Sequence, residues 1–374
     1  MRVLAVNVGS SSLKLDVWGA DLVRPFIKLE VRGIAGDRGG LVENGAVVER
    51  KVFADHAAAL AALLQRVPEL ERIARVGHRV VHGGSRYRGT TRVDETVLRD
   101  LEELVPLSPL HQVPMLAVMR ACRGFFPAVP HAAVFDTAFH SAMPPRAYTY
   151  AIPAAWREAG VRRYGFHGIA CADIVAQLGG ELRERAIILH LGAGCSATAL
   201  LKGKSIDTTM GFTPLEGLIM ATRSGDIDPG ALLFAQRNLA LTPQKVEYVL
   251  NSESGLLALS GSADMRDLLR RRDDEAVSAV EVFCYRAAKA VGALTVALGG
   301  LEQLIFSGGI GEHAAAVRAG IGALVAGLGV SIDADANNAD APIISAPAGA
   351  VRVDIIAVDE GRQIARDTMA LSLA

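Results

Sequence analysis

The sequence contains few of the features that mark nucleic-acid-binding, membrane-spanning or disulfide-stabilised proteins. Its 39 basic and 40 acidic residues leave a net charge of −1, which gives no reason to expect a nucleic-acid or acidic-membrane partner. The four cysteines are far apart and form no CxxC pair, so we expect a reducing cytoplasm and neither a zinc site nor a disulfide framework. The longest apolar stretch, residues 290–301, is too short to cross a bilayer. No signal-peptide pattern precedes the first expected strand, which again favours a cytoplasmic protein.

The length and composition indicate a two-domain α/β enzyme. At 374 residues the chain is too long for one typical core, so two domains are expected. Hydrophobic residues make up 51% of the chain and glycine occurs 38 times. This balance fits an α/β enzyme and argues against disorder.

A small polar turn lies between two expected strands in the opening stretch, MRVLAVNVGSSSLKLDVWG. Residues 3–6 form a short apolar run, and Leu13, Leu15 and Val17 recur at period two, so both flanks are predicted to be strands. The turn lacks the GxxxxGKS/T pattern of a Walker loop and the GxGxxG pattern. Its small residues, hydroxyl groups and Lys14 nevertheless suit a phosphate. An ordinary serine-rich hairpin is the alternative.

The same pattern recurs about half a chain later, in RAIILHLGAGCSATALLKGK. An expected strand at 187–191 leads into a turn with Gly192, Gly194 and Ser196, and His190 occupies the place of Asn7. Two such units indicate a duplicated fold with two facing phosphate loops, unless the two glycine and serine turns are alike by chance.

A third glycine-rich turn occurs in LEQLIFSGGIGEHAAAVRAGIGALVAGLGV. It follows an expected strand at 304–306 and precedes a helix predicted to begin at about Glu312. The free N–H groups of a helix start favour an anion in such a turn. Upstream, the segment 276–298 is predicted to be a core helix without a chemical role, because apolar residues recur at helical spacing: Val277, Val280, Phe283, Ala287, Val291, Leu294 and Leu298.

Histidine, arginine and carboxylate residues gather beside glycine or proline at predicted strand ends, where open α/β sheets bind ligands. His111 is expected in a loop because prolines lie on both sides of it. Each of these residues can instead be structural, since most histidines near strands are satisfied core residues. The candidates are His78, Arg79, His82, His111, Asp136, Thr137, His140, His167, Asp207, Glu216, Arg223, Asp226 and Asp228.

The candidate residues favour phosphoryl transfer. Arg79 and Arg223 suit a carboxylate or a transferring phosphate, because guanidinium binds both bidentately. Phosphoryl transfer needs positioning and charge neutralisation more than covalent help. Asp136 can act as a general base if the acceptor is a hydroxyl. A carboxylate acceptor needs no base, and Asp136 then organises arginine, water or metal.

A series of motifs resembles the acetate kinase family, which includes propionate and butyrate kinases. The motifs occur in family order from residue 3 to about residue 368: VNVGSSSLK, GHRVVHGG, SPLH, VFDTAFHSAMPP, YGFHG, HLGAG, TTMGFTPLEGL, TRSGDIDP, SGLLALSG with DMRDL, SGGIGE and DEGRQIARDT. The family belongs to the superfamily of actin-like ATPases, sugar kinases and heat-shock chaperones. The resemblance therefore implies an α/β fold of two duplicated actin-like, ribonuclease-H-like domains with a nucleotide cleft between them.

The resemblance also implies a reaction: reversible, Mg²⁺-dependent, direct in-line transfer of the ATP γ-phosphoryl group to acetate or propionate, giving ADP and an acyl phosphate. Arg79 and Arg223 would hold the acid and the phosphoryl group, His167 would stabilise the transition state, and Asp136 matches the family's catalytic aspartate. Other matched residues would bind metal (Mg²⁺ or Mn²⁺: Asn7, Glu360), nucleotide or phosphate (Ser10, Ser12, Lys14, His190, Leu191, Gly192, Ala193, Gly194, Asp264, Met265, Arg266, Gly309, Ile310, Gly311, Glu312, His313) and the acid (Arg79, Val81, Leu110, His111, Phe166, Pro214).

The resemblance further implies an N-terminal domain of residues 1–138 plus 360–374, a C-terminal nucleotide-binding domain of residues 139–359, and a homodimer. The chain departs from the family pattern at several places. Ala193 replaces the asparagine of HLGNG, and His313 replaces the asparagine of GIGEN. Further departures follow YGFHG and precede Glu360: Ile169, Ala170, Cys171, Val358 and Asp359.

Three other functions stay open. The departures leave room for pyrophosphate as the donor in place of ATP. A sugar kinase would need a polar acceptor site, whereas the matched acid-binding residues are largely apolar. A non-catalytic superfamily member would lack the acid-binding arginines, and both are present. Because one methylene changes binding by only about 1–3 kcal/mol, acetate and propionate cannot be separated from the sequence.

Overall fold

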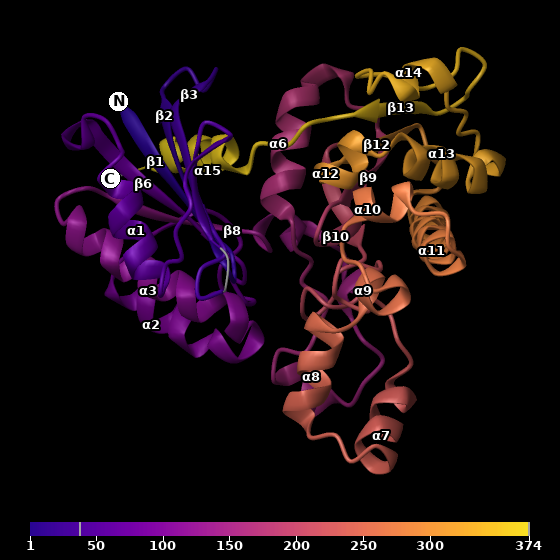
Figure 1. The fold of residues 1–374 in the computed structure, drawn as a ribbon, viewed down its shortest axis with the longest axis horizontal. Helices are drawn as coiled ribbons and strands as arrows, with labels where there is room; N and C mark the ends of the chain where they lie inside the picture. Colours follow the sequence, from indigo (N-terminus) through magenta and orange to yellow (C-terminus); the bar gives the residue numbers. More distant parts are fainter. Residues whose placement is uncertain (37–38, 373–374) are drawn as a thin grey trace. The chain divides into compact units, whose positions relative to one another are not determined.

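The computed structural model describes residues 1–36 and 39–372, which form two compact units (Figure 1). Unit 1 comprises Met1–Phe139, Gly168–Asp173 and Asp359–Ala374, and unit 2 comprises His140–His167 and Ile174–Val358. Among the described residues, none of the helices combines the length and apolar character that a bilayer-spanning segment needs.

Unit 1 is built on an eight-stranded sheet with the order β5-β4-β3-β2-β1-β6-β8-β7. β1 pairs antiparallel with β2 and parallel with β6, and β6 pairs parallel with β8. The elements are β1 (Arg2–Val8), β2 (Ser12–Gly19), β3 (Pro25–Arg32), β4 (Gly40–Glu43), β5 (Ala46–Glu49), α1 (His56–Leu64), β6 (Ile73–Val80), β7 (Thr91–Arg92), α2 (Glu95–Glu103), α3 (Pro109–Phe125), β8 (His131–Phe135) and α15 (Glu360–Ala370).

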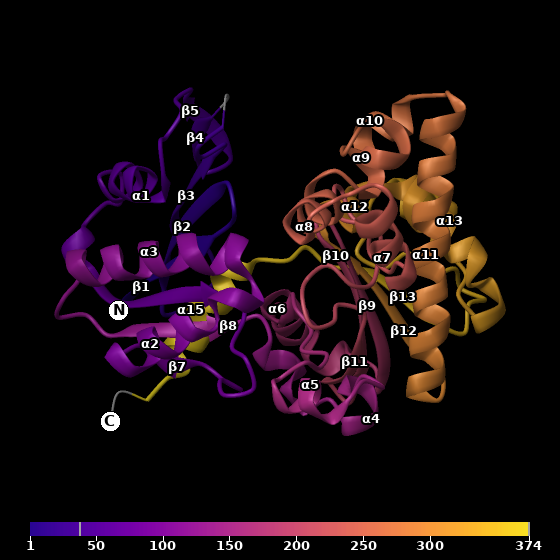
Figure 2. The ribbon, with the colours of Figure 1, turned by 90° about the horizontal axis from the view of Figure 1, so that it is seen from below.

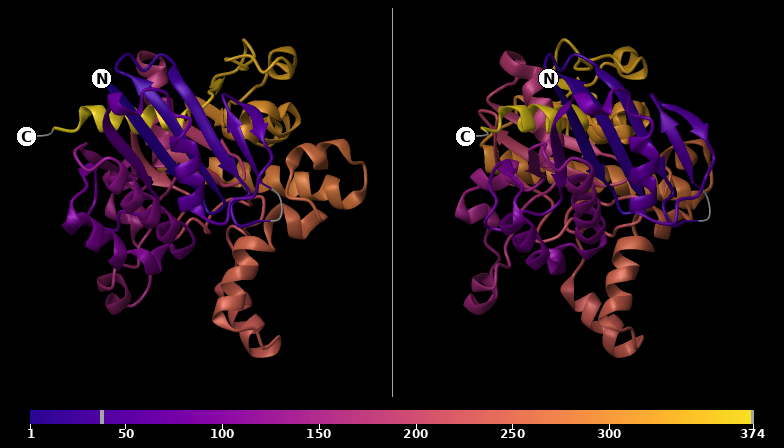
Figure 3. Two further views of the ribbon diagram at one scale, coloured as in Figure 1. Left: turned by 60° about the vertical axis from the view of Figure 1, so that its left-hand side comes forward. Right: turned by 90° about the vertical axis from the view of Figure 1, so that its left-hand side faces the viewer.

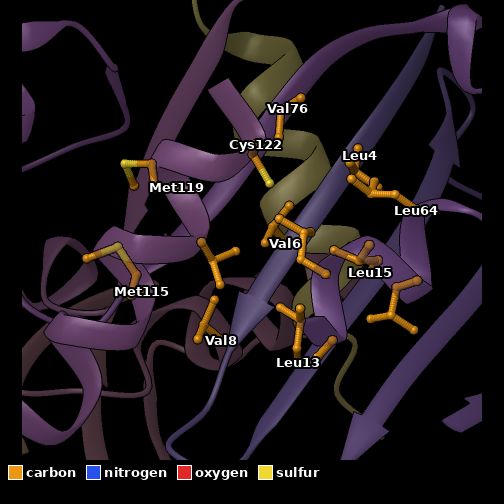
Figure 4. Packing of buried hydrophobic residues seen from close by; sticks show 14 of the residues in the cluster. Leu4, Val6, Val8, Leu13, Leu15, Leu64, Val76, Met115, Met119 and Cys122 are labelled. Carbon is orange, nitrogen blue, oxygen red and sulfur yellow. The ribbon is translucent and has the colours of Figure 1, made fainter. Parts of the chain in front are cut away.

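Alternate residues of β1 face opposite sides of this sheet, as the period of two requires. Leu4 and Val6 share a buried cluster with Met115 of α3 (Figure 4). Val3 points the other way and packs in a smaller cluster with Ile364 of α15. Figure 2 accordingly shows α3 on one side of β1 and α15 on the other. The first strand is therefore apolar on both faces because helices cover both.

Unit 2 is built on a five-stranded sheet with the order β11-β10-β9-β12-β13. β9 pairs antiparallel with β10 and parallel with β12. The elements are α4 (Pro145–Tyr148), α5 (Ala154–Glu158), β9 (Arg185–Leu191), β10 (Cys195–Leu201), β11 (Lys204–Thr208), α7 (Pro229–Asn238), α8 (Pro243–Ser252), α9 (Gly255–Ser260), α10 (Met265–Arg270), α11 (Asp274–Leu298), β12 (Gln303–Ser307), α12 (Gly308–His313), α13 (Ala315–Leu324), α14 (Ala334–Asn338) and β13 (Arg352–Ile355). Helix α6 (Gly168–Leu178) begins in unit 1 and ends in unit 2. Figure 3 shows α7 and α8 projecting as an arm of unit 2.

The two sheets repeat one arrangement. In unit 1 the strand β1 lies between antiparallel β2 and parallel β6, and in unit 2 the strand β9 lies between antiparallel β10 and parallel β12. This repetition confirms the duplication expected from the two similar turns. The predicted strands at 3–6, 187–191 and 304–306 and the helix at 276–298 are also confirmed.

Three local predictions are wrong. The helix after the third turn begins at Gly308 and not at Glu312, so the glycines themselves form its first turn. His111 lies in α3 and not in a loop, because Pro109 occupies the first helical position, where its missing N–H is not needed. Val277 of α11 is 44% exposed and does not belong to the core.

A buried carboxyl group on α15 should make the stability of the protein depend on pH. Burial raises the pKa of Asp367 to about 6, although Gln363 donates a hydrogen bond of 2.8 Å to it. Between its usual pKa of about 4 and about 6, the folded chain holds a proton that the unfolded chain has lost. The free energy of unfolding therefore falls as pH rises through this window.

We expect Asp367→Asn to raise the melting temperature, by an amount corresponding to on the order of 1 kcal/mol at pH 8 and to less at pH 4.5. Thermal unfolding at the two pH values measures this difference. An equal shift at both values would show that the carboxyl group is not responsible.

Candidate active site

Four polar side chains of unit 1 meet where parallel strands end. Asn7 lies near the end of β1, Arg79 near the end of β6, and Asp136 directly after β8. Because these strands run parallel, their carboxyl ends share one edge of the sheet. Glu360, the first residue of α15, joins them. We call these four residues the carboxylate–guanidinium cluster.

A chain of hydrogen bonds connects the carboxylate–guanidinium cluster. Nε and Nη2 of Arg79 donate to Oδ2 of Asp136 at 3.0 and 2.7 Å. Nη1 of Arg79 donates to Oδ1 of Asn7 at 3.0 Å, and Nδ2 of Asn7 donates to Oε2 of Glu360 at 2.7 Å. Each hydrogen bond restricts the orientation of the next side chain, so the guanidinium is held through all three of its nitrogens by two partners.

Asp136 is fully buried, and burial raises the pKa of its carboxyl group above the usual value even though the cation of Arg79 opposes this shift. Among the residues that the structure describes, its Oδ1 has no hydrogen-bond partner. Its backbone is held by Gly168, whose N–H donates to the Asp136 carbonyl at 3.0 Å. A Cβ on Gly168 would lie 2.1 Å from that carbonyl oxygen, so only glycine fits there. The free Oδ1 is able to accept a further donor or cation.

Two imidazole rings of unit 2 are each paired with a serine. Nδ1 of His167 lies 3.0 Å from Oγ of Ser196, and Nδ1 of His190 lies 2.9 Å from Oγ of Ser307. The ring centroids of the two histidines are 4.8 Å apart. His167 has a left-handed backbone, with φ of 58°, directly before α6. The serine hydroxyl at each Nδ1 restricts the orientation of its imidazole ring.

Glycine-rich turns of unit 2 lie next to these rings. A Cβ on Gly194 would lie 3.1 Å from Nε2 of His167, and a Cβ on Gly192 would lie 4.0 Å from the Gly309 nitrogen. Gly308, with φ of 74°, sits so close to Leu191 that a Cβ would lie 2.6 Å from its carbonyl oxygen. The second and third turns are therefore adjacent, and their backbone N–H groups suit an anion such as a phosphate.

Arg223 lies in unit 2 and Arg79 in unit 1. Nη1 of Arg223 donates to the carbonyl of Pro214 at 3.1 Å and lies 3.7 Å from Sδ of Met220. The same nitrogen is 3.7 Å from the Cβ position of Gly194. Arg223 thus belongs to the group of residues around the second glycine turn.

The other candidates have structural partners. Glu216 accepts hydrogen bonds from Tyr150 and Arg163, Asp226 accepts from the Gly217 N–H, and Asp228 caps α7. The His140 ring lies between Ser205 and the Phe166 carbonyl, and burial lowers its pKa to about 4. Further partners are Nε2 of His78 with Nδ1 of His131, the Gly84 N–H with Nδ1 of His82, the Gly83 N–H with Thr137, the Thr208 N–H with Asp207, and Ser108 with His111.

The remaining residues matched by resemblance are divided between the units. In unit 1, Ser10, Ser12 and Lys14 belong to the first turn and β2, Val81 is buried, and Leu110 lies in α3 with a side chain outside the described residues. In unit 2, Asp264 caps α10 and pairs with Arg266, while Met265 and Phe166 are buried and Pro214 is half-buried. Leu191 ends β9 and Ala193 lies in the second turn. Helix α12 contains the other five residues: Gly309, Ile310, Gly311, Glu312 and His313. The His313 ring is 73% exposed and lies 3.9 Å from both Glu312 and Asp340.

No pairing with a histidine was predicted from the sequence for Ser196 or Ser307. Ser307 ends a fully buried strand beside a glycine-rich turn, directly opposite His190 in the β9–β12 pairing. Ser307 lies just before the third glycine-rich turn, as Asn7 and His190 lie just before the other two. This correspondence could have suggested a polar role for Ser307. Ser196 pairs with His190 across β9 and β10.

We expect Ser196→Ala to lower turnover about tenfold with little change in the Michaelis constants, because one hydrogen bond of about 1–1.5 kcal/mol holds the His167 ring. Steady-state kinetics measure this effect. Ser205→Ala is the matched control, since Ser205 is as buried as Ser196 and pairs with the ring of His140. If both variants lose equal activity, the pairing at His167 has no special role.

The chain is similar to acetate and propionate kinases both in sequence and in structure. A model of the Acetokinase family matches residues 2–366. The acetate kinase of Micrococcus luteus is 42% identical across 100% of both chains, and that of Carboxydothermus hydrogenoformans is 39% identical across 99% of both. Among solved structures, a propionate kinase from Francisella tularensis has a TM-score of 0.93 at 34% identity, covering 99% of this chain and 100% of that one. The acetate kinase of Porphyromonas gingivalis has a TM-score of 0.89 at 34% identity, covering 98% of each.

Proposed function

Because the chain belongs to the acetokinase family, we propose that it transfers the γ-phosphoryl group of ATP reversibly and in line to acetate or propionate. ATP-dependent phosphorylation of a carboxylate to an acyl phosphate is the activity of the family, and the chain has the family's duplicated actin-like fold. The choice of acid and the roles of individual residues are proposals that go beyond the general activity of the family. The observation that carries them is the Arg79 guanidinium, held by Asp136 and Asn7 at the ends of parallel strands.

The reaction forms a bond between a carboxylate oxygen and the γ-phosphorus and breaks the bond between that phosphorus and the oxygen of ADP. The acid is already ionised at neutral pH, so no proton has to be removed. Asp136 therefore acts by orienting Arg79, and not as a base. Arg79 and Arg223 neutralise the acid and the transferring group, and His167 donates a hydrogen bond from Nε2 to the developing charge.

The match to the family motifs supports a proposal for the nucleotide and acid sites. We propose that the glycine turns at 192–194 and 309–313 bind the nucleotide with residues 264–266, and that the first turn binds phosphate. Val81, Leu110, His111, Phe166 and Pro214 contact the acid. The two compact units correspond in this proposal to the two expected domains. All four cysteines are buried, as suits a protein of the cytoplasm.

A divalent cation, Mg²⁺ or Mn²⁺, fits the residues of unit 1. Glu360 and Asn7 supply oxygen ligands, and the free Oδ1 of Asp136 adds negative charge nearby. Within residues 1–36 and 39–372, no three His, Cys, Asp or Glu side chains gather as a cage that could hold a metal. Mg²⁺ commonly uses one or two carboxylates and completes its shell with water and substrate phosphates. When bound, the ion neutralises charge on the phosphoryl groups.

We also propose that the chain is a homodimer. Large apolar side chains on the α7–α8 arm are exposed, among them Phe234 at 58%, Leu239 at 61% and Tyr248 at 53%. Burying these large apolar side chains in a subunit interface would be favourable. Light scattering after size exclusion measures the mass, and a monomer across micromolar concentrations would contradict the proposal.

Hydroxylamine trapping tests the proposed reaction, because it converts acyl phosphates into coloured hydroxamates. We expect product with ATP, Mg²⁺ and acetate or propionate, and none when the acid is omitted. ATP hydrolysis without hydroxamate would indicate a sugar kinase or a regulatory ATPase. Replacing ATP by pyrophosphate in the same assay tests the alternative donor.

Glu360→Gln should raise the Mg²⁺ concentration needed for half-maximal activity by about tenfold or more, because a neutral amide is a weaker ligand for a hard cation than a carboxylate. A Mg²⁺ titration at saturating ATP measures this change. An unchanged titration would remove Glu360 from the metal role.

A further inference from the structure

A second set of charged residues in unit 1 lies outside the carboxylate–guanidinium cluster. Asp173, in α6, is completely buried, and its carboxylate accepts two hydrogen bonds from Arg362 of α15: Nε to Oδ1 at 2.9 Å and Nη2 to Oδ2 at 2.8 Å. Arg366, one turn further along α15, lies 3.7 Å from Oδ1. Such a two-point contact restricts both the distance and the angle between α6 and the first turn of α15.

The same carboxylate also holds the backbone that leads into α15. The Asp359 N–H donates to Oδ2 of Asp173 at 2.9 Å. The side chain of Asp359 in turn accepts the Arg362 N–H at 3.0 Å as the N-cap of α15 and pairs with Lys28 at 2.6 Å. Asp173 therefore contacts the residue before Glu360 and the residue two positions after it.

These contacts close a ring through unit 1. Helix α6 is attached to the cluster at its first residue, where the Gly168 N–H donates to the Asp136 carbonyl at 3.0 Å. From Asp136 the hydrogen bonds pass through Arg79 and Asn7 to the Glu360 carboxylate. The ring returns through the first turn of α15 to Asp173. Glu360 is thus held directly by Asn7, through its side chain, and indirectly by Asp173, through its neighbours Asp359 and Arg362.

We propose that Asp173 is a positioning residue that sets the place and direction of the Glu360 carboxylate for the divalent cation. The inference rests on the proposed metal role of Glu360. A metal ligand is supported by groups that orient it, and loss of such a group weakens metal binding by about 10–100-fold. Asp173 acts one step further away, through the Asp359 N–H before Glu360 and the Arg362 side chain after it.

Asp173→Asn is the sharpest test, because asparagine keeps the shape and one oxygen acceptor but loses the charge that binds Arg362. We expect the affinity for Mn²⁺, measured by electron paramagnetic resonance with saturating ADP, to fall about tenfold. Amide hydrogen exchange of residues 358–364 should become faster. The Michaelis constant for ATP at saturating Mg²⁺ should change less than the Mg²⁺ requirement.

Arg75→Ala is the matched control. Nη1 of Arg75 donates to the carbonyls of Thr368, Met369 and Leu371 at 2.9, 3.0 and 2.8 Å, so it holds the far end of α15. Its loss loosens the same helix without touching Glu360, and Mn²⁺ affinity should stay within about twofold of wild type. Equal losses in Arg75→Ala and Asp173→Asn would overturn the inference, because any loosening of α15 would then suffice.

Two further variants separate this inference from the proposed function. If Glu360→Gln leaves Mn²⁺ affinity unchanged, the proposed metal role of Glu360 is wrong. If Glu360→Gln weakens binding and Asp173→Asn does not, the metal role stands and the positioning role is wrong. Arg362→Met combined with Asp173→Asn should be no worse for Mn²⁺ than either change alone, since both break the same contact. Losses that multiply would contradict a shared contact.

Discussion

Replacing Arg79 with alanine is expected to lower turnover by about a thousandfold, to raise the Michaelis constant for the acid, and to destabilise unit 1. The activity loss follows because a positioned guanidinium that neutralises a transferring phosphoryl group contributes on the order of 10³-fold. The stability loss follows because Asp136 is fully buried and would lose the cation that it contacts at 2.7 Å. Breaking such a buried pair costs about 3 kcal/mol.

Activity and stability can be measured separately. Hydroxamate kinetics measure the activity of the variant, and thermal unfolding at pH 5 and pH 8 measures its stability. The stability loss should be smaller at pH 5, because a buried Asp136 with a raised pKa takes up a proton when Arg79 is absent. Arg79→Lys should restore much of the stability and little of the turnover, since an ammonium group cannot bind Asp136 and Asn7 in the same plane. A variant that only unfolds more easily would mean that Arg79 is structural.

Replacing Arg223 with alanine is expected to lower turnover by a comparable factor of about 10³ while leaving the melting temperature nearly unchanged. Its Nη1 donates to the carbonyl of Pro214, a weaker structural contact than the buried ion pair of Arg79. Pro214 is only half-buried, so we expect water to replace the lost donor after the change. The Arg79→Ala and Arg223→Ala variants should therefore differ in melting temperature but lose a similar factor in turnover.

Arg286→Ala is the control for Arg223, because Nη2 of Arg286 donates to the Asp226 carbonyl at 2.7 Å and so supports the segment that carries Arg223. We expect less than about a threefold change in turnover. If Arg286→Ala lost as much activity as Arg223→Ala, the effect would come from a loosened segment and not from the missing guanidinium.

The strands and turns that carry the site were predictable because their signals are local. Short apolar runs before the three glycine-rich turns are confirmed as β1, β9 and β12. The helix start at Gly308 was not predictable in this way. A left-handed glycine packed against the Leu191 carbonyl depends on a neighbouring strand, and glycine on its own suggests a turn.

The chemistry of individual polar residues was less predictable. Arg79 and Asp136 were singled out and do pair, but Glu216 and Asp228, which looked equally suitable, have structural partners. The partners of the two site histidines lie 29 and 117 positions away, and Arg362 lies 189 positions from Asp173. No local pattern can indicate contacts over such separations.

The sequence by itself determined the class of fold, its duplication and the family to which the chain belongs, because strand periodicity, glycine turns and ordered motifs are properties of neighbouring residues. Only the tertiary structure decided which charged side chains pair and which serines face the imidazole rings. It also showed that Asp173 accepts from the Asp359 N–H before Glu360 and from the Arg362 side chain after it. The physical reason is that parallel strands and distant helices bring together residues that are remote along the chain, and burial then makes each pairing energetically necessary.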